Sequence, residues 1–238
     1  MMGNYTDSVT VYDAINQSRG KDYAAESQKI HTLIMQYKQS LGRDLLDVAC
    51  GTGGHLLYLR NHYQVEGTDL SSDMLAVAHQ RCPDIPLHQA NMLDFDLQRQ
   101  YDAIVCLFSS IGYVQTVENL QRAIAAMSSH LVAGGVLIIE PWLAPEQYIP
   151  GTLHATYVNQ PELKVARMSV SQQKGRLAVM EYHFLVATPQ GVEHFTELNE
   201  MGLFTTAEYR AAFEAAGLTV HHDAEGLIGR GLCVGVKH

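Results

Sequence analysis

A short apolar run at residues 45–49 leads directly into a glycine-rich stretch, Cys50-Gly51-Thr52-Gly53-Gly54. A helix is predicted to follow over residues 55–61. A glycine-rich turn between a strand and a helix lets the backbone approach a ligand closely, and it is typical of sheets with parallel strands. This segment therefore predicts an α/β fold that holds a ligand at the carboxyl end of its first strand.

Strand-like and helix-like patterns alternate along the first part of the chain. The expected strands are residues 45–49, 64–69, 87–90, 101–108 and 136–140. The expected helices are residues 22–39, 55–61, 71–81 and 116–131, the last of which is stopped by Gly134-Gly135. Strands joined by helical crossovers predict a parallel sheet with helices on both faces.

The C-terminal part continues this scheme. Thr205 and Glu208 fit a capping box at the head of a helix that ends at Gly217. Strands at residues 218–222 and 231–236 complete an expected sheet of seven strands.

Residues 143–202 show a different pattern. Apolar and polar residues alternate with a period of two, and turns at Lys174-Gly175 and Pro189-Gln190-Gly191 separate the runs. We therefore expect an antiparallel β insertion over residues 143–202, placed after the fifth strand, where insertions commonly cover the site. Residues 1–142 and 203–238 are then the core.

The glycine pattern narrows the ligand. A dinucleotide-binding loop needs a third glycine at the position that Leu56 occupies, and no phosphate-binding GK[ST] string is present. What remains is Asp-x-x-x-Gly-x-Gly, beginning at Asp47, with Asp69 at the end of the second strand. A carboxylate there can accept both ribose hydroxyls of an adenosine, so the pattern predicts an adenosine-containing ligand.

Composition excludes several functions. The 238 residues are 47% hydrophobic and 17% charged, which indicates a globular chain, and the net charge of −9 argues against nucleic acid or anionic membrane as a partner. The longest apolar run is too short to span a bilayer, and the N-terminus lacks the features of a signal peptide. Four cysteines without a CxxC pair suit the reducing cytoplasm, where we expect the protein.

Twelve histidines raise the question of a metal. His221 and His222 are adjacent, so in a strand they point to opposite faces and cannot share one ion. His183 and His194 have no ligand spacing, and neither HExxH nor a Cys/His finger occurs. We therefore expect no metal site, although one of these histidines remains a candidate base toward the acceptor.

The glycine loop, Asp69, Asn91-Met92, the Phe108-Ser-Ser-Ile-Gly-Tyr113 segment and Glu140-Pro-Trp142 together resemble the class I S-adenosylmethionine-dependent methyltransferases. The resemblance implies a Rossmann-like seven-strand methyltransferase sheet and S-adenosylmethionine as the cofactor. The cofactor-binding residues that it implies are Tyr12, Arg19, Ala49, Gly51, Gly53, Asp69, Leu70, Met74, Asn91, Met92 and Phe108.

Further segments narrow the resemblance. Tyr12-Asp13, Arg19-Gly-Lys-Asp-Tyr23 and Gly229-Arg230-Gly231 are similar to those of bacterial enzymes that N-methylate dTDP-linked amino sugars during antibiotic biosynthesis. The resemblance implies a small-molecule acceptor, a dTDP-amino sugar being favoured, and a homodimer is a further expectation. Leu143, Val179 and Leu227-Ile228 depart from the family pattern, which keeps open an N- or O-methyltransferase whose acceptor lacks a nucleotide.

The chemistry suggests roles for particular residues. Methyl transfer from a sulfonium is a direct displacement, so the protein mainly aligns the acceptor, and an amine needs no base once it is neutral. Tyr12 and Tyr113 are the expected catalytic residues, and Tyr113 also belongs to the acceptor site. Arg19, or Lys21 in its place, would bind the methionyl carboxylate.

The acceptor side has two further candidates. Arg230, between two glycines, would contact a pyrophosphate, and Trp142 would line the acceptor pocket. A non-catalytic module that only binds the cofactor is a third hypothesis, which the set of Tyr12, Gly51, Gly53 and Asp69 argues against.

Overall fold

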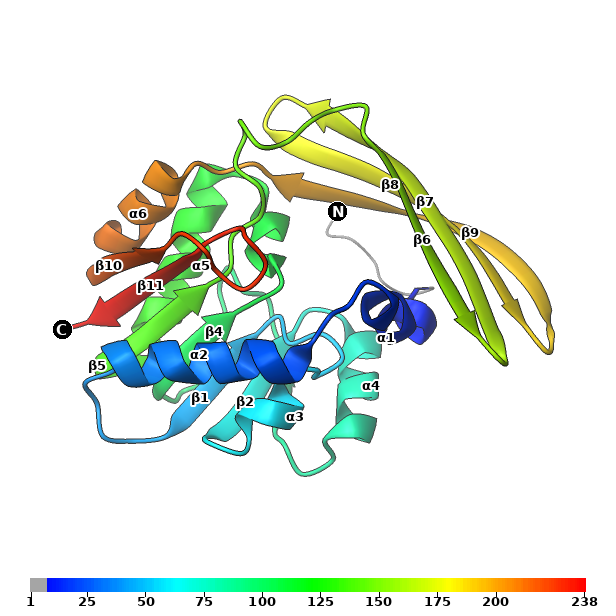
Figure 1. Ribbon diagram of the computed structural model, residues 1–238. Helices are drawn as coiled ribbons and strands as arrows, with labels where there is room; N and C mark the ends of the chain where they lie inside the picture. The colour runs from blue at the N-terminus through cyan, green and yellow to red at the C-terminus, as the bar shows by residue number, and fades with distance from the viewer. Residues whose placement is uncertain (1–7) are drawn as a thin grey trace.

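The computed structural model describes residues 8–238, which form two separate β-sheets with helices around the larger one (Figure 1). The larger sheet has seven strands in the order β10-β11-β5-β4-β1-β2-β3. All its pairings are parallel except those of β11 with β5 and β10. Its strands are β1 Asp44–Val48, β2 Gln64–Asp69, β3 Leu87–Gln89, β4 Tyr101–Cys106, β5 Leu131–Ile139, β10 Leu218–Asp223 and β11 Leu232–Lys237.

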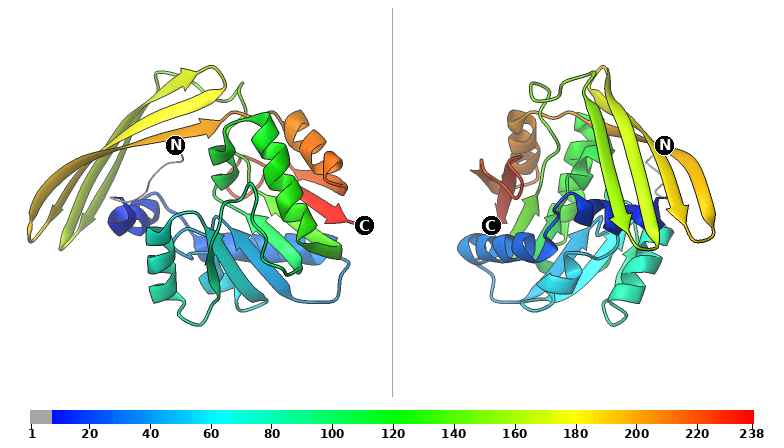
Figure 2. Two further views of the ribbon diagram at one scale, coloured as in Figure 1. Left: turned by 180° about the vertical axis from the view of Figure 1, so that it is seen from behind. Right: turned by 45° about the vertical axis from the view of Figure 1, so that its right-hand side comes forward.

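Helices cover both faces of this sheet, as the alternation predicts (Figures 1 and 2). The helices are α1 Val9–Ser18, α2 Tyr23–Tyr37, α3 Leu56–Leu59, α4 Ser72–Arg81, α5 Val117–Ser129 and α6 Thr206–Ala215, with a 3₁₀ turn η1 at Ser110–Val114. Successive strand residues face opposite layers: Leu46 and Ile104 pack with α5 and α6, whereas Leu45 and Ala103 pack with α2 and α3. None of the helices within residues 8–238 has the length and apolar character needed to cross a membrane.

Side-chain caps fix where the helices begin. The capping box predicted from Thr205 and Glu208 is present in both directions. Ser71 Oγ likewise accepts a hydrogen bond from the Met74 N–H at the head of α4, at 3.2 Å. The loop that ends at Ser71 therefore has a fixed geometry, which matters because it adjoins the glycine loop.

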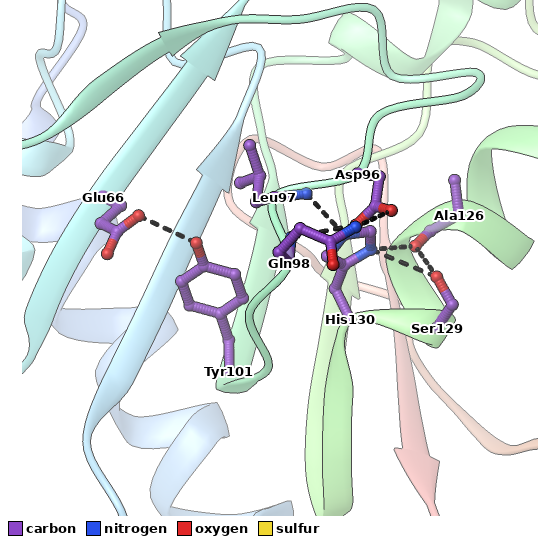
Figure 3. A network of polar contacts seen from close by, with 8 residues as sticks. All are labelled: Glu66, Asp96, Leu97, Gln98, Tyr101, Ala126, Ser129 and His130. Atoms are coloured by element: carbon purple, nitrogen blue, oxygen red, sulfur yellow. Dashed lines mark hydrogen bonds and ion pairs between the residues drawn. The ribbon is translucent and has the colours of Figure 1, made fainter.

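The start of the fifth strand differs from the prediction. Helix α5 ends at Ser129 and β5 already begins at Leu131, so Gly134-Gly135 lie inside the strand and do not stop the helix. His130 makes the early stop: its Nδ1 donates to the Ala126 carbonyl at 2.8 Å, and its Nε2 accepts from the Leu97 N–H at 3.1 Å (Figure 3). These two bonds cap the helix and turn the chain into the sheet. Gly134 has φ +75 and its carbonyl accepts from the Gln39 and Ser40 N–H groups.

The second sheet is antiparallel, in the order β6-β7-β8-β9, and we call it sheet B. Its strands are β6 Leu153–Gln160, β7 Leu163–Lys174, β8 Leu177–Thr188 and β9 Gly191–Gly202, all within the range predicted for the insertion. Sheet B arches away from the core, and α1 lies beneath its concave face (Figures 1 and 2).

Helix α1 was not predicted from the sequence. It has only ten residues, fewer than an isolated helix needs to be stable in water. Its Val11 and Ile15 pack on Val158, Val165 and nearby aromatic residues of sheet B. Tertiary packing therefore stabilises α1, and the spacing of four between its buried Val11 and Ile15 was a weak local signal.

Candidate active site

A cavity of about 870 Å³ lies between the carboxyl ends of the parallel strands, helix α1 and the inner face of sheet B. Nearly all the residues predicted for the site line it: Tyr12, Arg19, Ala49, Gly51, Asp69, Leu70, Met74, Asn91, Met92, Phe108, Tyr113, Trp142 and Arg230. The exception is Gly53. These residues come from both ends of the chain, so the fold brings the predicted set together in one place.

Two glycines of the loop, Gly51 and Gly53, have different roles. Gly51 has φ +55, and a Cβ built on it would meet no atom within 4 Å, so this backbone faces open space in the cavity wall. Gly53 has φ +75, and a Cβ there would lie 3.3 Å from the Ala78 Cβ of α4. Gly51 therefore leaves room for a ligand, whereas Gly53 allows close packing of the loop on the helix.

Asp69 ends β2 and is held in front of the glycine loop. Its Oδ2 accepts from the Gly51 N–H at 2.8 Å and its Oδ1 accepts from the Ser71 N–H at 2.9 Å. Burial raises the pKa of the Asp69 carboxyl, and these backbone donors lower it in part. Each carboxylate oxygen keeps a further lone pair, so the group can still accept from a ligand hydroxyl.

A second cavity of about 30 Å³ adjoins the first and shares Tyr12, Gly51 and Phe108 with it. Asp47 lines it, is 1% exposed, and its Oδ2 has no hydrogen-bond partner among the described residues. Burial raises the pKa of Asp47 to about 8. A buried carboxylate oxygen without a donor fits a cationic amine. Asp47 was not predicted as a site residue, although it begins the glycine pattern.

Lys21, the alternative to Arg19, lies behind the cavity wall. Its side chain is 5% exposed, and its Nζ lies 2.6 Å from Glu26 Oε2 and 3.8 Å from the centroid of the Phe108 ring. It lines neither cavity, whereas Arg19 lines the large one. Lys21 therefore supports Phe108 from behind, and Arg19 remains the candidate for an anionic ligand group.

The turn after β4 carries Phe108 and Ser109 in left-handed conformations, with φ +54 and +61. The buried Glu140 holds this turn, because its Oε2 accepts from the Phe108 N–H at 2.6 Å. Left-handed backbone at such side chains is costly and concentrates at functional sites. The turn presents Phe108 and, one 3₁₀ turn later, Tyr113 to the cavity.

Three arginines that line the cavity influence Tyr182 of sheet B: Arg19, Arg167 and Arg230. Arg230 lies 4.4 Å from the Trp142 ring centroid and donates to Ser109 Oγ at 2.9 Å. Arg167 lies 4.6 Å from the centroid of the Tyr182 ring. Burial raises the pKa of the Tyr182 hydroxyl, and all three guanidinium groups act to lower it. Arg167 and Tyr182 were not predicted, since they belong to the insertion, where only the strand pattern was informative.

Within residues 8–238 no group of three or more His, Cys, Asp and Glu side chains is arranged to hold a metal. His183 and His194 stack on each other with ring centroids 5.9 Å apart. They lie on the face of sheet B that points away from the cavity, because the alternate residues Tyr182 and Phe184 line it. Neither histidine can act on a ligand in this cavity.

Known proteins resemble this chain along its whole length. A family model described as a methyltransferase domain matches residues 45–135. A dTDP-3-amino-3,4,6-trideoxy-alpha-D-glucopyranose N,N-dimethyltransferase from Streptomyces venezuelae is 46% identical over 232 residues, which cover 97% of this chain and 98% of that protein. The chain belongs to the family of S-adenosylmethionine-dependent sugar N-methyltransferases. A dTDP-4-amino-2,3,4,6-tetradeoxy-D-glucose N,N-dimethyltransferase from Saccharopolyspora spinosa is 39% identical and covers 98% of the chain and 93% of its own length.

Solved structures have the same fold as this chain. DesVI of Streptomyces venezuelae superposes with a TM-score of 0.92 at 45% identity, covering 98% of this chain and 99% of that one. The S-adenosylmethionine-bound CalS10, an amino pentose methyltransferase, superposes with a TM-score of 0.87 at 39% identity, covering 96% and 97%. The Rossmann-like methyltransferase fold, the enzyme class and the cofactor predicted from the sequence are therefore confirmed.

The residues present fit the cofactor of this methyltransferase family. Asp69 has carboxylate oxygens beside an open glycine loop, where they could accept hydrogen bonds from ribose hydroxyls. The buried Oδ2 of Asp47, which has no hydrogen-bond partner among the described residues, could accept from the methionyl ammonium. Gly51, Tyr12 and Phe108 line both cavities, so one elongated ligand could extend through the two. When bound, the cofactor supplies an electrophilic methyl group, and the chain supplies orientation and a dry cavity.

Proposed function

We propose that this enzyme methylates the amino group of a dTDP-linked deoxysugar, in two successive transfers. The relatives that match nearly the full chain at 39–46% identity are named for dTDP-amino sugars and for N,N-dimethylation. Such a substrate combines an anionic diphosphate with a small amine. The cavity must therefore accommodate negative charge on its acceptor side.

The observation that carries the proposal is the charge distribution inside the cavity. The arginines that line the cavity are Arg19, Arg167 and Arg230, and all three act on the pKa of Tyr182 in sheet B. The carboxylates that line it are Asp69, Asp73 and Glu197. The planar fork of an arginine matches the oxygens of a phosphate, so arginines that line one cavity can bind a diphosphate. In a chain of net charge −9, this local cluster favours a diphosphate-bearing acceptor.

The reaction requires little acid–base catalysis from the protein. A neutral amine attacks the methyl carbon with its lone pair, the carbon–sulfur bond breaks, and the new ammonium loses a proton to solvent. The chain therefore acts chiefly by holding the amine in line with the methyl group. Tyr12 on α1 and Tyr113 on η1 both line the cavity, and we propose that they orient the two reactants.

Of the residues that depart from the family pattern, some line the cavity and can affect acceptor binding, whereas Val179 does not. Val179 lies on the outer face of sheet B, since its neighbours Ala178 and Met180 point inward, so it cannot select an acceptor. Leu143 and Ile228 line the cavity. These two positions can adjust the fit of the sugar without removing the arginines.

A thermal-shift titration with dTDP in saturating S-adenosylhomocysteine tests the proposal. A ligand that binds only the folded state raises the melting temperature with the logarithm of its concentration. We expect dTDP to add a shift to that of S-adenosylhomocysteine alone. The Arg230→Met variant should lose most of the added shift, whereas Arg210→Met, on the exposed face of α6, should keep it.

Two negative results of this titration would have different consequences for the proposal. If S-adenosylhomocysteine shifts the melting temperature and dTDP adds nothing, the enzyme class stands and the nucleotide-linked acceptor is wrong. If dTDP binds equally well to Arg230→Met, the nucleotide is bound elsewhere in the cavity.

We also propose that the enzyme is a homodimer joined through the outer face of sheet B. Exposed apolar side chains gather there: Tyr157, Met168, Val170, Leu185, Val192 and Leu198. Exposed apolar side chains that gather on one face of a sheet are typical of a protein–protein contact surface. A second copy is the partner that carries the same apolar surface, as a two-fold interface requires.

Leu185→Glu should separate the proposed dimer. Leu185 is 50% exposed and pairs across the sheet with Ala166 and His194, in the middle of the apolar face. A charge there would be buried at the interface, so we expect light scattering to report a monomer. Met35→Glu is the control, because Met35 is 63% exposed but lies on α2. A wild type that is monomeric at micromolar concentration would contradict the proposal.

For the cellular site we propose the cytoplasm. All four cysteines are free and buried, as is usual where thiols stay reduced.

A further inference from the structure

Asp13 connects helix α1 to the glycine loop. Its Oδ1 accepts from Thr52 Oγ1 at 2.9 Å, and Arg81 Nη2 donates to its Oδ2. Arg81 Nη1 also donates to the Thr52 carbonyl at 2.8 Å and to Thr52 Oγ1 at 3.2 Å. The three side chains thus form a closed ring that joins α1, the loop and the last turn of α4.

The ring is partly shielded from water. The side chains of Arg81 and Asp13 are 25% and 24% exposed, and Thr52 is buried. An arginine that donates to two partners from separate nitrogens is held more firmly than a single exposed ion pair. Thr52 stands between Gly51 and Gly53, so the ring holds the loop next to Gly51, which lines both cavities.

The opposite side of α1 is attached to sheet B. The Ser8 N–H and Oγ donate to the Glu197 carboxylate at 2.9 Å and 2.7 Å, just before α1 begins. Val11 and Ile15 pack in the apolar cluster of sheet B. Helix α1 is therefore held from both sides, and its position over the loop depends on these contacts because it is too short to be stable alone.

Tyr12 is the residue that the ring would position. It lies next to Asp13 and lines both the large cavity and the small one beside Asp47. A shift of α1 away from the loop would move Tyr12 and widen the cavity next to Gly51. We propose that Asp13 and Arg81 are positioning residues, which clamp α1 onto Thr52 and so place Tyr12 against the cofactor and slow the cofactor's departure. This inference holds whichever acceptor is methylated.

Breaking the ring should leave the loop itself folded. The Cys50 N–H donates to the Thr68 carbonyl at 2.9 Å and the Gly53 N–H donates to the Cys50 carbonyl at 3.0 Å, and neither bond involves the ring. The effect of a variant on cofactor retention can therefore be separated from unfolding.

The test measures dissociation of S-adenosylhomocysteine by stopped-flow fluorescence. Trp142 is the single tryptophan and lines the cavity, so it is a natural reporter. We expect Asp13→Asn and Arg81→Met each to raise the dissociation rate about tenfold, the size of effect that losing a partly buried charged contact gives. Arg81→Lys, which keeps the charge but not the fork, should restore part of the retention.

Two controls decide the outcome. Arg60→Met makes the same change in the Arg60–Asp84 pair, whose side chains are 35% and 62% exposed, and should leave the rate unchanged. The double variant Asp13→Asn/Arg81→Met should be no faster than either single variant, because both break one ring. Rates equal to that of Arg60→Met, or additive effects in the double variant, would overturn the proposal.

Discussion

Asp69→Ala is expected to weaken S-adenosylhomocysteine binding about 100-fold or more. Hydrogen bonds to a charged group contribute about 1.5–3 kcal/mol each, and a ribose would offer Asp69 two of them. The free enzyme holds this carboxylate in place with the Gly51 and Ser71 N–H groups, so no reorganisation is needed on binding. Calorimetric titration of the variant with S-adenosylhomocysteine measures the loss directly.

The same two backbone bonds mean that alanine also frees the glycine loop. Asp69→Asn separates the effects, because an amide keeps one acceptor oxygen and the shape but not the charge. We expect it to bind more weakly than the wild type and more tightly than Asp69→Ala. Asp84→Asn, whose side chain is 62% exposed and lines neither cavity, should bind normally. An Asp69→Ala variant with wild-type affinity would exclude Asp69 from the cofactor site.

The parts of the fold that could be predicted are those whose signal is local. The strands from Leu45 to Asp69 and the capping box at Thr205 follow from short patterns, and the structure confirms both. Helix α1 and the early start of β5 depend on distant partners. Sheet B stabilises the first, and the Leu97 N–H bound to His130 fixes the second. A pattern read from a short stretch of sequence does not contain these contacts, because the partners lie far apart along the chain.

The site divides in the same way. Gly51 and Asp69 were predictable because parallel neighbouring strands bring their carboxyl ends to one edge of the sheet. Arg167 and Tyr182 reach the cavity only because sheet B folds back over it, and their sequence context shows nothing but strand alternation. Asp47 was only partly predictable. The glycine pattern contains it, but its role follows from the buried carboxylate oxygen, which has no hydrogen-bond partner among the described residues.

Asp47→Asn should stabilise the free enzyme above neutral pH and lower its affinity for the cofactor. Burial raises the pKa of Asp47 to about 8 from the ordinary value of 3.8. Between those values the folded state holds a proton that the unfolded state has released, so the free energy of unfolding falls as pH rises through this window. Asparagine does not titrate, so the cost of an ionised buried carboxylate at about pH 8 disappears, and the melting temperature should exceed that of the wild type by about 3 °C or more.

Cofactor affinity should change in the opposite direction. An ammonium beside Asp47 favours the ionised carboxylate, so binding below about pH 8 expels the proton, and affinity rises with pH until that value is reached. The ligand's own amine titrates identically against both proteins, so their difference isolates Asp47. Calorimetry in buffers of different ionisation enthalpy should show more proton release for the wild type than for Asp47→Asn, which should also bind about tenfold more weakly. Unchanged affinity and unchanged proton release would show that the ammonium lies elsewhere. A stability gain coupled to a binding loss would identify Asp47 as a carboxylate kept in the core, at a cost to the fold, for the cofactor's positive charge.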